Sequence, residues 1–474
     1  MKKLLPKNHF FRSAGVLVGG TAGGQLIMVL SAPLLSRLYS PEQFGLLAVY
    51  ISILSLFAVI ASLRYELAIP LAESAAEAAN VAVLSFFCVL CVTVIAAIIV
   101  MFMRQEISEQ LAMPELANYF WLLPLSVLVL GGYQVFNYWA VREKKFDTIA
   151  RSKIVQAISI LSVQFIGYRA GGVMLLVGQA SGQGAGTISL ASNILKGSAL
   201  KQCSRQGILK AAYRYRQLPL FSTWAGFFNA AGQQLPALML AAFFSASSVG
   251  QYALAQRVLM LPMSVIGTAI GQVFFGNAAE AHREGRLGPL ARKIYEQLSS
   301  VAMPAALLLV LAGPQIFLFV FGDDWEQAGV FARWMAPWLY MVFITSPLST
   351  LLSVLEKERL GMFLQAFLLA ARAFAIAIGA WVGDVQTAVI LFSIVSALYW
   401  LLFLLWIMQS THNSCFLLAK LELKRLALSL LCLMPLWYGL SASSTSFSLY
   451  SGVALSVLML AAYYIIYFLK AYRS

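Results

Sequence analysis

The sequence predicts an all-α polytopic membrane protein with about fourteen transmembrane helices. The 474 residues are 61% hydrophobic and only 11% charged, whereas soluble domains are about 25% charged. Apolar runs of about twenty residues recur along nearly the whole chain, and each is long enough to cross ~30 Å of hydrocarbon as a helix. The alternating pattern of a membrane-spanning β-barrel does not occur in the sequence.

The candidate spans follow one another at short intervals. Their approximate limits are 13–36, 44–70, 79–103, 117–141, 149–168, 171–195, 218–244, 249–276, 297–321, 331–355, 359–382, 385–409, 424–441 and 447–469. The connections between them leave no room for a soluble catalytic domain.

The basic residues lie mostly on one side of the predicted membrane. With the amino terminus inside, the cytoplasmic segments contain 26 of the 33 Lys and Arg residues, the outer loops contain four, and the spans contain three. This asymmetry follows the positive-inside rule and predicts that both termini are cytoplasmic. The net charge of +14 therefore reflects topology and an affinity for membrane lipids, and we expect no nucleic-acid partner.

The two halves of the chain look related. At a fixed offset of 205, the outer-loop motif SPEQFG (40–45) aligns with SASSVG (245–250), between matching spans. Six spans, a basic link and six more spans predict a parallel repeat. The link carries Lys and Arg at i,i+4 spacing, which suits either a helix on the inner leaflet or a solvated linker. We therefore predict a first six-helix lobe (1–195), a basic cytoplasmic linker (196–217), a second six-helix lobe (218–409) and two additional helices (410–474).

Small residues and prolines predict how some spans pack. Glycines four residues apart allow two helices to approach closely. They are Gly15, Gly19 and Gly23 in the first span and Gly178, Gly182 and Gly186 in the sixth. Prolines inside spans, Pro314 among them, favour kinks because each removes a backbone hydrogen bond.

Charged residues inside the spans are the strongest functional signal. Arg64, Arg257 and Arg372 lie in apolar runs, where only one carboxylate, Glu66, shares their depth. Such residues usually face a bundle interior or a wet cavity and mark a pathway, although a structural ion pair or a contact with a headgroup would also explain them. A guanidinium stays charged when buried and matches phosphate oxygens. The set therefore predicts an anionic cargo.

Uncharged polar residues in the spans extend this set. Gln25 lies in the first span, and Asn229 and Gln233 share one face of the seventh at i,i+4 spacing. Amides of this kind suit sugar hydroxyls. No metalloprotease, nucleophile-elbow or phosphate-loop motif occurs. We therefore expect a protein that is not an enzyme and that has no catalytic residue, metal or cofactor.

Four motifs resemble one family of membrane proteins. They are SRLYSPEQFG (36–45), SLRYELAIP (62–70), YRQLPL (215–220) and VGQY (249–252). In order and placement they resemble the polysaccharide and O-antigen flippases of the multidrug/oligosaccharidyl-lipid/polysaccharide exporter superfamily. The family more often has Phe-Pro where this chain has Leu218-Pro219.

The resemblance implies two six-helix lobes arranged in a V, with two extra helices. It implies a cavity lined by spans 1, 2, 7 and 8, and hence by Gln25, Arg64, Asn229, Gln233 and Arg257. The cargo would be an undecaprenyl-diphosphate-linked oligosaccharide, moved across the bacterial inner membrane by alternating access for lipopolysaccharide or other polysaccharide biosynthesis, with polymerase machinery as a partner.

Three residues receive further roles. Arg372 and Arg257 are expected to contact the diphosphate or an acidic sugar, and Glu66 is expected to couple a proton or cation to transport. The competing readings are a multidrug exporter or an exporter of another lipid-linked precursor in the same superfamily, and a membrane polysaccharide polymerase.

Overall fold

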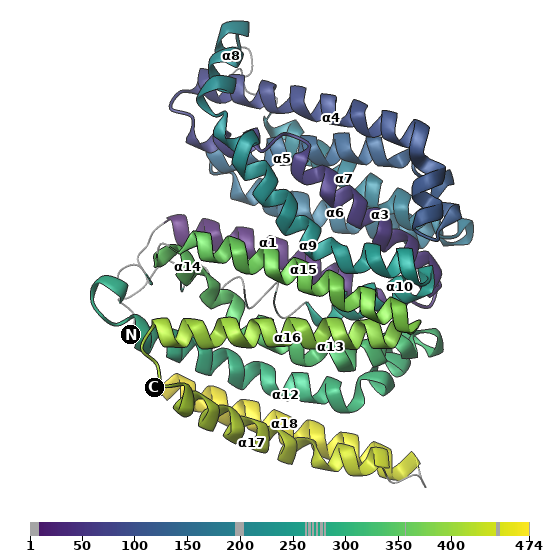
Figure 1. The fold of residues 1–474 in the computed structure, drawn as a ribbon, viewed down its shortest axis with the longest axis vertical. Helices are drawn as coiled ribbons and strands as arrows, with labels where there is room; N and C mark the ends of the chain where they lie inside the picture. Colours follow the sequence, from purple (N-terminus) through teal and green to yellow (C-terminus); the bar gives the residue numbers. More distant parts are fainter. Residues whose placement is uncertain are drawn as a thin grey trace. The chain divides into compact units, whose positions relative to one another are not determined.

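The computed structural model describes residues 9–194, 203–260, 281–355, 357–441 and 446–473, together with residues 263, 267, 270, 271, 274 and 278. The described chain is almost entirely helical and contains no strand, which confirms the predicted all-α class. It divides into two compact units, Met1–Arg257 and Val258–Ser474. In Figure 1 the first runs from purple to teal and the second from green to yellow.

The first unit contains ten α-helices among its described residues, with short 3-10 and π turns between some of them. The α-helices are α1 (His9–Leu30), α2 (Ala32–Leu35), α3 (Pro41–Ile60), α4 (Ala75–Gln110), α5 (Leu122–Arg142), α6 (Phe146–Ile166), α7 (Val173–Ile194), α8 (Arg205–Arg214), α9 (Thr223–Phe243) and α10 (Ala246–Leu259). The turns are η1 (Tyr65–Leu71), η2 (Pro114–Asn118), η3 (Tyr168–Ala170) and η5 (Leu218–Ser222).

The helices of the first unit pack in a layered bundle. Helix α6 contacts α1 and α7, α5 contacts α4 and α7, and α3 contacts α9. Figure 1 shows α4 running alongside α5. Inside the bundle the Tyr50 hydroxyl donates to Ser126 Oγ at 2.7 Å, which joins α3 to α5. Such bonds matter because a buried hydroxyl without a partner would cost about 1–3 kcal/mol.

The glycine spacing predicts one helix contact and misplaces another. Gly178, Gly182 and Gly186 of α7 do lie against α6, where a Cβ atom would meet Ile160, Gln156 and Gln164. In α1, however, Gly19 and Gly23 have open space around them. Their neighbours make the contact instead: a Cβ at Gly20 would collide with Ala150, and one at Gly24 would lie 3.1 Å from the Lys153 carbonyl oxygen.

The second unit contains the remaining helices that the structure describes. They are α12 (Leu287–Phe321), α13 (Glu326–Thr345), α14 (Leu351–Val354), α15 (Glu358–Val382), α16 (Val385–Ser410), α17 (Cys415–Ser441) and α18 (Ser446–Arg473), with η7 (Asp323–Trp325) and η8 (Ser346–Thr350).

Helix α12 is the centre of the second unit. It packs against α13 and α17, while α16 packs against α13 and α15. Helices α17 and α18 lie side by side, and the hydroxyls of Tyr463 and Tyr464 in α18 donate to the α12 carbonyls of Ser300 and Val301 at 3.0 and 2.9 Å. Helix α12 kinks at Ala312 (φ −123°, ψ 17°), two residues before Pro314, as expected where proline removes a hydrogen bond.

Six helices are long and apolar enough to cross a membrane, judged over the described residues. They are Pro41–Ile60, Ala75–Gln110, Phe146–Ile166, Leu287–Phe321, Phe363–Val382 and Val385–Ser410. The chain is thus a multi-pass membrane protein. The total of fourteen spans stays a prediction, and most of the predicted span 249–276 beyond residue 260 lies outside the described residues.

One predicted span is not a continuous helix. The sequence predicts a helix over 44–70, but α3 ends at Ile60, residues 61–64 form turns, and a 3-10 segment follows from Tyr65 to Leu71. No glycine or proline lies at 61–64, so no local signal marks the break. This interruption places the first of the predicted functional arginines.

Candidate functional site

Arg64 lies at the break between α3 and η1 in a strained conformation. Leu63 and Arg64 both have positive φ, at 50° and 63°. A left-handed conformation costs an L-residue roughly 1–2 kcal/mol, and such strain persists only where the surrounding structure imposes it. The break turns Arg64 away from the helical path that the sequence predicts.

Contacts from neighbouring helices hold the break in place. Arg142 at the end of α5 donates from Nη1 to the carbonyl oxygens of Ile69 and Ala72, at 3.0 and 2.5 Å. These are the free carbonyls at the carboxyl end of η1, which a cation satisfies well. Tyr65 donates from its hydroxyl to the Ala212 carbonyl in α8 at 3.3 Å. The segment is therefore fixed from two sides.

The Arg64 guanidinium lies against α9. A Cβ atom at Gly226 would come within 3.0 Å of Arg64 Nη2 and 3.2 Å of its Cζ, so glycine leaves the room that the side chain occupies. Arg64 Nε is buried and has no hydrogen-bond partner among the described residues. A buried cationic donor without an acceptor is costly. The side chain therefore has unused capacity to bind an anion.

Glu66 lies close to this arginine in the chain but is not paired with it. Its side chain is 2% exposed and accepts a hydrogen bond from Ser62 Oγ. No ion pair joins it to Arg64 within the described part of the chain. Tyr138 of α5 lies within electrostatic reach of both residues. The predicted span 44–70 places both residues on one helix, which is wrong: Arg64 lies at the break and Glu66 in η1.

The polar residues of α9 divide into two groups. Asn229 and Gln233 are exposed, so they are available to a ligand. Gln234, one position further, instead accepts a hydrogen bond from Ser52 Oγ of α3 at 3.0 Å. It fastens α9 to α3 beside the break. The i,i+4 spacing selects Asn229 and Gln233 but gives no sign that Gln234 carries the contact.

Gln25 and Arg257 occupy helices α1 and α10. Gln25 is exposed on α1, next to Gly24, where α1 lies against α6. Arg257 is in the last turn of α10 and is partly buried. A cation in this position interacts favourably with the helix dipole.

Arg372 belongs to the second unit and is held by aromatic rings. Its side chain in α15 is 9% exposed. The guanidinium carbon lies 5.2 Å from the centre of the Trp338 ring and 5.1 Å from that of Phe392, and Nε donates to Ser396 Oγ at 2.9 Å. These cation–π contacts stabilise a desolvated guanidinium. The packing gives Arg372 a structural role that is independent of any cargo.

A partly buried acid that the sequence does not single out joins α17 to the rest of its unit. Glu422 accepts hydrogen bonds from Tyr295, Ser299 and Tyr340 at 2.7, 2.5 and 2.6 Å. It also forms an ion pair with Arg425 at 2.9 Å. The hydroxyls that meet Glu422 come from helices far away in sequence.

The linker between the predicted lobes forms helix α8, which docks on the start of α4. Arg214 forms ion pairs with Glu73 and Glu77, and Tyr215 donates to Glu77 Oε1 at 3.0 Å. Burial raises the pKa of Tyr215, and the bond to Glu77 adds to this. The Ser204 amide donates to the Asn80 side chain at 2.9 Å. The described part of the linker is thus helical over Arg205–Arg214, and its contact with lipid stays a prediction.

The two outer-loop motifs contact each other reciprocally. A Cβ at Gly45 would collide with the Ala246 carbonyl oxygen, and one at Gly250 would collide with that of Pro41. With the offset of 205, Gly45 corresponds to Gly250 and Pro41 to Ala246. Exchanging each residue for its counterpart turns the Gly45–Ala246 contact into the Gly250–Pro41 contact. A two-fold related repeat requires this arrangement.

Fold and site together define a multi-pass helical membrane protein with a cation held at a break in one of its helices. The chain belongs to the family of polysaccharide biosynthesis proteins, whose model matches residues 34–329. This confirms the family resemblance that the sequence motifs indicate.

Comparison with known proteins gives one curated relative and several similar folds. The succinoglycan biosynthesis transport protein ExoT of Rhizobium meliloti (strain 1021) is 24% identical over 401 residues, covering 81% of this chain and 77% of ExoT. The lipid II flippase MurJ, in an inward closed conformation, has a TM-score of 0.76 at 13% identity, covering 96% of this chain and 99% of MurJ. An inward-facing multidrug resistance MATE transporter of the MOP superfamily has a TM-score of 0.66 at 14% identity, covering 84% and 94%.

Proposed function

We propose that the protein is a flippase that moves an undecaprenyl-diphosphate-linked oligosaccharide from the cytoplasmic to the periplasmic leaflet of the bacterial inner membrane. Three observations support this: membership of the polysaccharide biosynthesis family, a fold similar to that of a lipid II flippase, and cations within the apolar helices. The observation that carries the proposal is Arg64, a buried guanidinium nitrogen without a partner among the described residues.

The chemistry of Arg64 suits a diphosphate. Its guanidinium offers a flat set of donors that matches phosphate oxygens and stays charged in an apolar setting. Asn229 and Gln233 are exposed amides that suit sugar hydroxyls. We propose that these residues, with Gln25, Arg257 and Arg372, contact the headgroup while the polyprenyl tail stays in lipid.

Transport by alternating access needs elements that move against each other. We propose the predicted lobes, 1–195 and 218–409, as these elements, with 196–217 as the link and 410–474 as an addition. Both termini are proposed to be cytoplasmic, because basic residues concentrate on that side. Polymerase machinery on the periplasmic side is the proposed recipient of the cargo.

Replacing Arg64 tests the proposal. We expect Arg64→Ala to lower export of the lipid-linked glycan at least about tenfold, the effect of losing ~1.4 kcal/mol of binding, with protein level unchanged. Arg64→Lys should restore export only in part, since lysine keeps the charge and loses the planar fork. The measurement is glycan display in cells that depend on this protein, alongside its abundance in membranes.

The matched control is Arg104→Ala. It removes an exposed arginine near the carboxyl end of helix α4 in the first unit. Its export should stay within about twofold of wild type. Normal export by Arg64→Ala would contradict the assignment of Arg64 as a cargo contact.

A second candidate function is export of a drug or another lipid-linked precursor. The similarity to a multidrug MATE transporter favours keeping it. The two candidates separate by cargo charge: a cationic drug would be repelled by Arg64, so its export should rise or stay constant in Arg64→Ala, whereas export of a diphosphate lipid should fall. A third reading, a polysaccharide polymerase, predicts chain elongation in vitro.

A further inference from the structure

A cavity in the second unit lies apart from the residues discussed above. Its volume is about 770 Å³, and its lining comes from two short stretches, 282–296 and 410–413. The first leads into α12 and the second joins α16 to α17. Four predicted spans separate these stretches, so an even number of crossings brings both to one face. That face is cytoplasmic by the distribution of basic residues.

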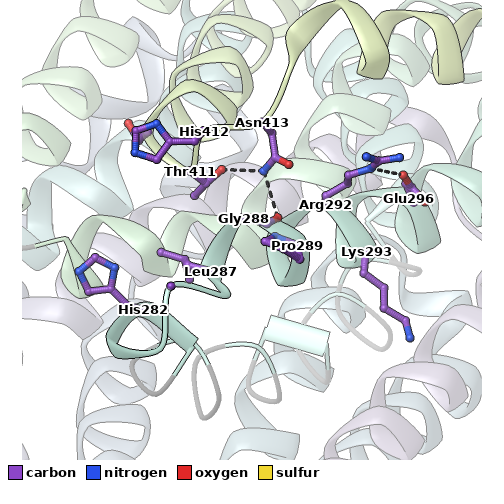
Figure 2. A pocket seen from close by; sticks show the side chains of 12 residues that line it. His282, Leu287, Gly288, Pro289, Arg292, Lys293, Glu296, Thr411, His412 and Asn413 are labelled. Carbon is purple, nitrogen blue, oxygen red and sulfur yellow. Dashed lines mark hydrogen bonds and ion pairs between the residues drawn. The ribbon is translucent and has the colours of Figure 1, made fainter.

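The lining of this cavity, which we call the basic pocket, carries more basic than acidic side chains. It includes His282, Arg292, Lys293 and His412, with Glu296 as the one carboxylate among the described lining residues. Glu296 is already paired with Arg292, whose Nε lies 2.7 Å from its Oε1. Figure 2 shows this pair at one side of the pocket and His412 at another. Lys293 and the two imidazoles thus have no opposing acid in the described lining.

The connection that carries His412 is built as a rigid helix end. The amide of His412 donates to the Gln409 carbonyl at 3.0 Å and that of Asn413 to Met408 at 2.8 Å. This is a Schellman end, in which the left-handed position is usually glycine. Here His412 occupies it with φ 57°. Ala112 and Lys144 occupy the same position at the ends of α4 and α5, so the conformation fixes where His412 lies without assigning it a role.

The two halves of the basic pocket are fastened to each other. Asn413 Nδ2 donates to the Gly288 carbonyl at 3.0 Å and to Thr411 Oγ1 at 2.9 Å, as the dashed lines in Figure 2 show. A Cβ at Gly288 would collide with the Thr411 carbonyl oxygen. The pocket walls are therefore fixed before any ligand binds, which lowers the cost of binding.

We propose that the basic pocket binds a phosphate-bearing headgroup at the cytoplasmic face. Its volume is within the range of small-molecule sites. Arg292 is paired with Glu296, and Asn413 Nδ2 bonds to Gly288 and Thr411. The donors for phosphate oxygens are therefore Lys293 and the imidazoles of His282 and His412. The headgroup could belong to the lipid-linked cargo or to an anionic phospholipid. The cargo source rests on the proposed function, whereas the anion site rests on the geometry alone.

Binding of inorganic pyrophosphate tests the pocket. The full-length protein is placed in nanodiscs of phosphatidylcholine and titrated calorimetrically. We expect Lys293→Ala to weaken binding at least about tenfold, since one charged hydrogen bond to the anion is lost. Arg283→Ala, which removes an exposed charge next to His282 that does not line the pocket, should change affinity less than about twofold. Equal losses in both variants, or no binding by wild type, would overturn the proposal.

A second variant separates binding from folding. His412→Gly relieves the left-handed strain, so it should raise the unfolding midpoint while it weakens pyrophosphate binding. Its control is Lys144→Gly, which replaces another exposed residue of positive φ (56°) and removes a charge far along the chain. This control should raise the midpoint and leave binding unchanged. Unchanged binding in His412→Gly would show that His412 is not part of the site. If binding by Lys293→Ala is also unchanged, the proposed site is wrong.

Two competitors identify the source of the phosphate. If phosphatidylglycerol in the nanodisc abolishes pyrophosphate binding, the ligand is a phospholipid; if undecaprenyl diphosphate does so instead, the ligand is the cargo. Competition by neither would count against a headgroup site. Arg64→Ala should still bind pyrophosphate here. A wild-type chain that binds pyrophosphate and moves no glycan lipid would refute the proposed function and leave the basic pocket standing.

Discussion

Arg64 and Arg372 illustrate two ways in which a guanidinium is held away from bulk water. Arg372 lies between two aromatic rings and donates to a serine hydroxyl. Arg64 instead lies at a strained break with Nε unsatisfied among the described residues. The first arrangement stabilises a packed interface, and the second leaves binding capacity. The sequence gives the same prediction for both residues, since it shows only an arginine in an apolar run.

At this scale we expect Arg372→Ala to lower the free energy of unfolding by about 2 kcal/mol, because the rings of Trp338 and Phe392 lose their cation and its packing. Arg372→Met, which keeps most of the volume, should lose about half as much. Denaturant unfolding in detergent measures both. Unchanged stability together with lost export would instead leave Arg372 as a cargo contact alone.

Among the elements, the Glu422 cluster decides how α17 is attached. One carboxylate receives three hydroxyls from α12 and α13 and pairs with Arg425. Removing this acceptor takes a partner from three buried hydroxyls, which costs more than the bonds themselves contribute. The tyrosines of α18 add further bonds to α12 carbonyls, so the last two helices are firmly joined to their unit.

We therefore expect Glu422→Ala to destabilise the second unit by about 2–3 kcal/mol, with Glu422→Gln intermediate because the amide still accepts hydrogen bonds. The control Glu109→Ala removes an exposed carboxylate at the end of α4 and should cost less than about 0.5 kcal/mol. Thermal unfolding followed by a fluorescent thiol probe reports each change. Equal effects of the Glu422 and Glu109 variants would rule out a structural role for the cluster.

The positions of most helices could be predicted from the sequence, because apolar runs bounded by charges and loop residues depend on local composition alone. Finer features could not. The contact face of α1 is Gly20 and Gly24 rather than Gly19 and Gly23, since the seam is set by what α6 presents. The break at 61–64 carries no glycine or proline, and it is stabilised by Arg142, which lies two helices further along the chain.

For the candidate site, the i,i+4 spacing predicted two exposed residues of α9 and missed the residue that bonds to α3. Asn229 and Gln233 are exposed, whereas Gln234 bonds to Ser52 of α3. Gln233 and Gln234 are adjacent amides of the same type, and only the helix turn between them directs their side chains to different sides. The Glu422 cluster could not be predicted either, because its hydroxyl partners belong to other helices. They are Tyr295, Ser299 and Tyr340.

For the whole molecule, the distribution of charge suggests what drives transport. An anionic headgroup that moves outward across an inside-negative membrane gains roughly 2.3 kcal/mol per charge per 100 mV. The buried Glu66 provides a group that could add a proton or cation to the cycle. Both driving forces act at the scale of the whole molecule, because they require the cargo or the coupling ion to cross the full membrane.

We expect flipping in proteoliposomes to be fastest with the potential imposed in the export direction and to slow at zero potential and equal pH. Glu66→Gln should reduce the response to a pH gradient and keep the response to potential. A fluorescent lipid-linked oligosaccharide, quenched when it reaches the outer leaflet, gives the rate. A rate that ignores both gradients would argue against either driving force.

The reciprocal contact of Gly45 and Gly250 has a consequence for how this chain can change over time. A single methyl group at either position would clash with the facing backbone and force the same two segments apart. Neither position can compensate for the other, because each already lies at the limit of approach. The reciprocal contact thus doubles the number of places at which the smallest substitution would force these two segments apart.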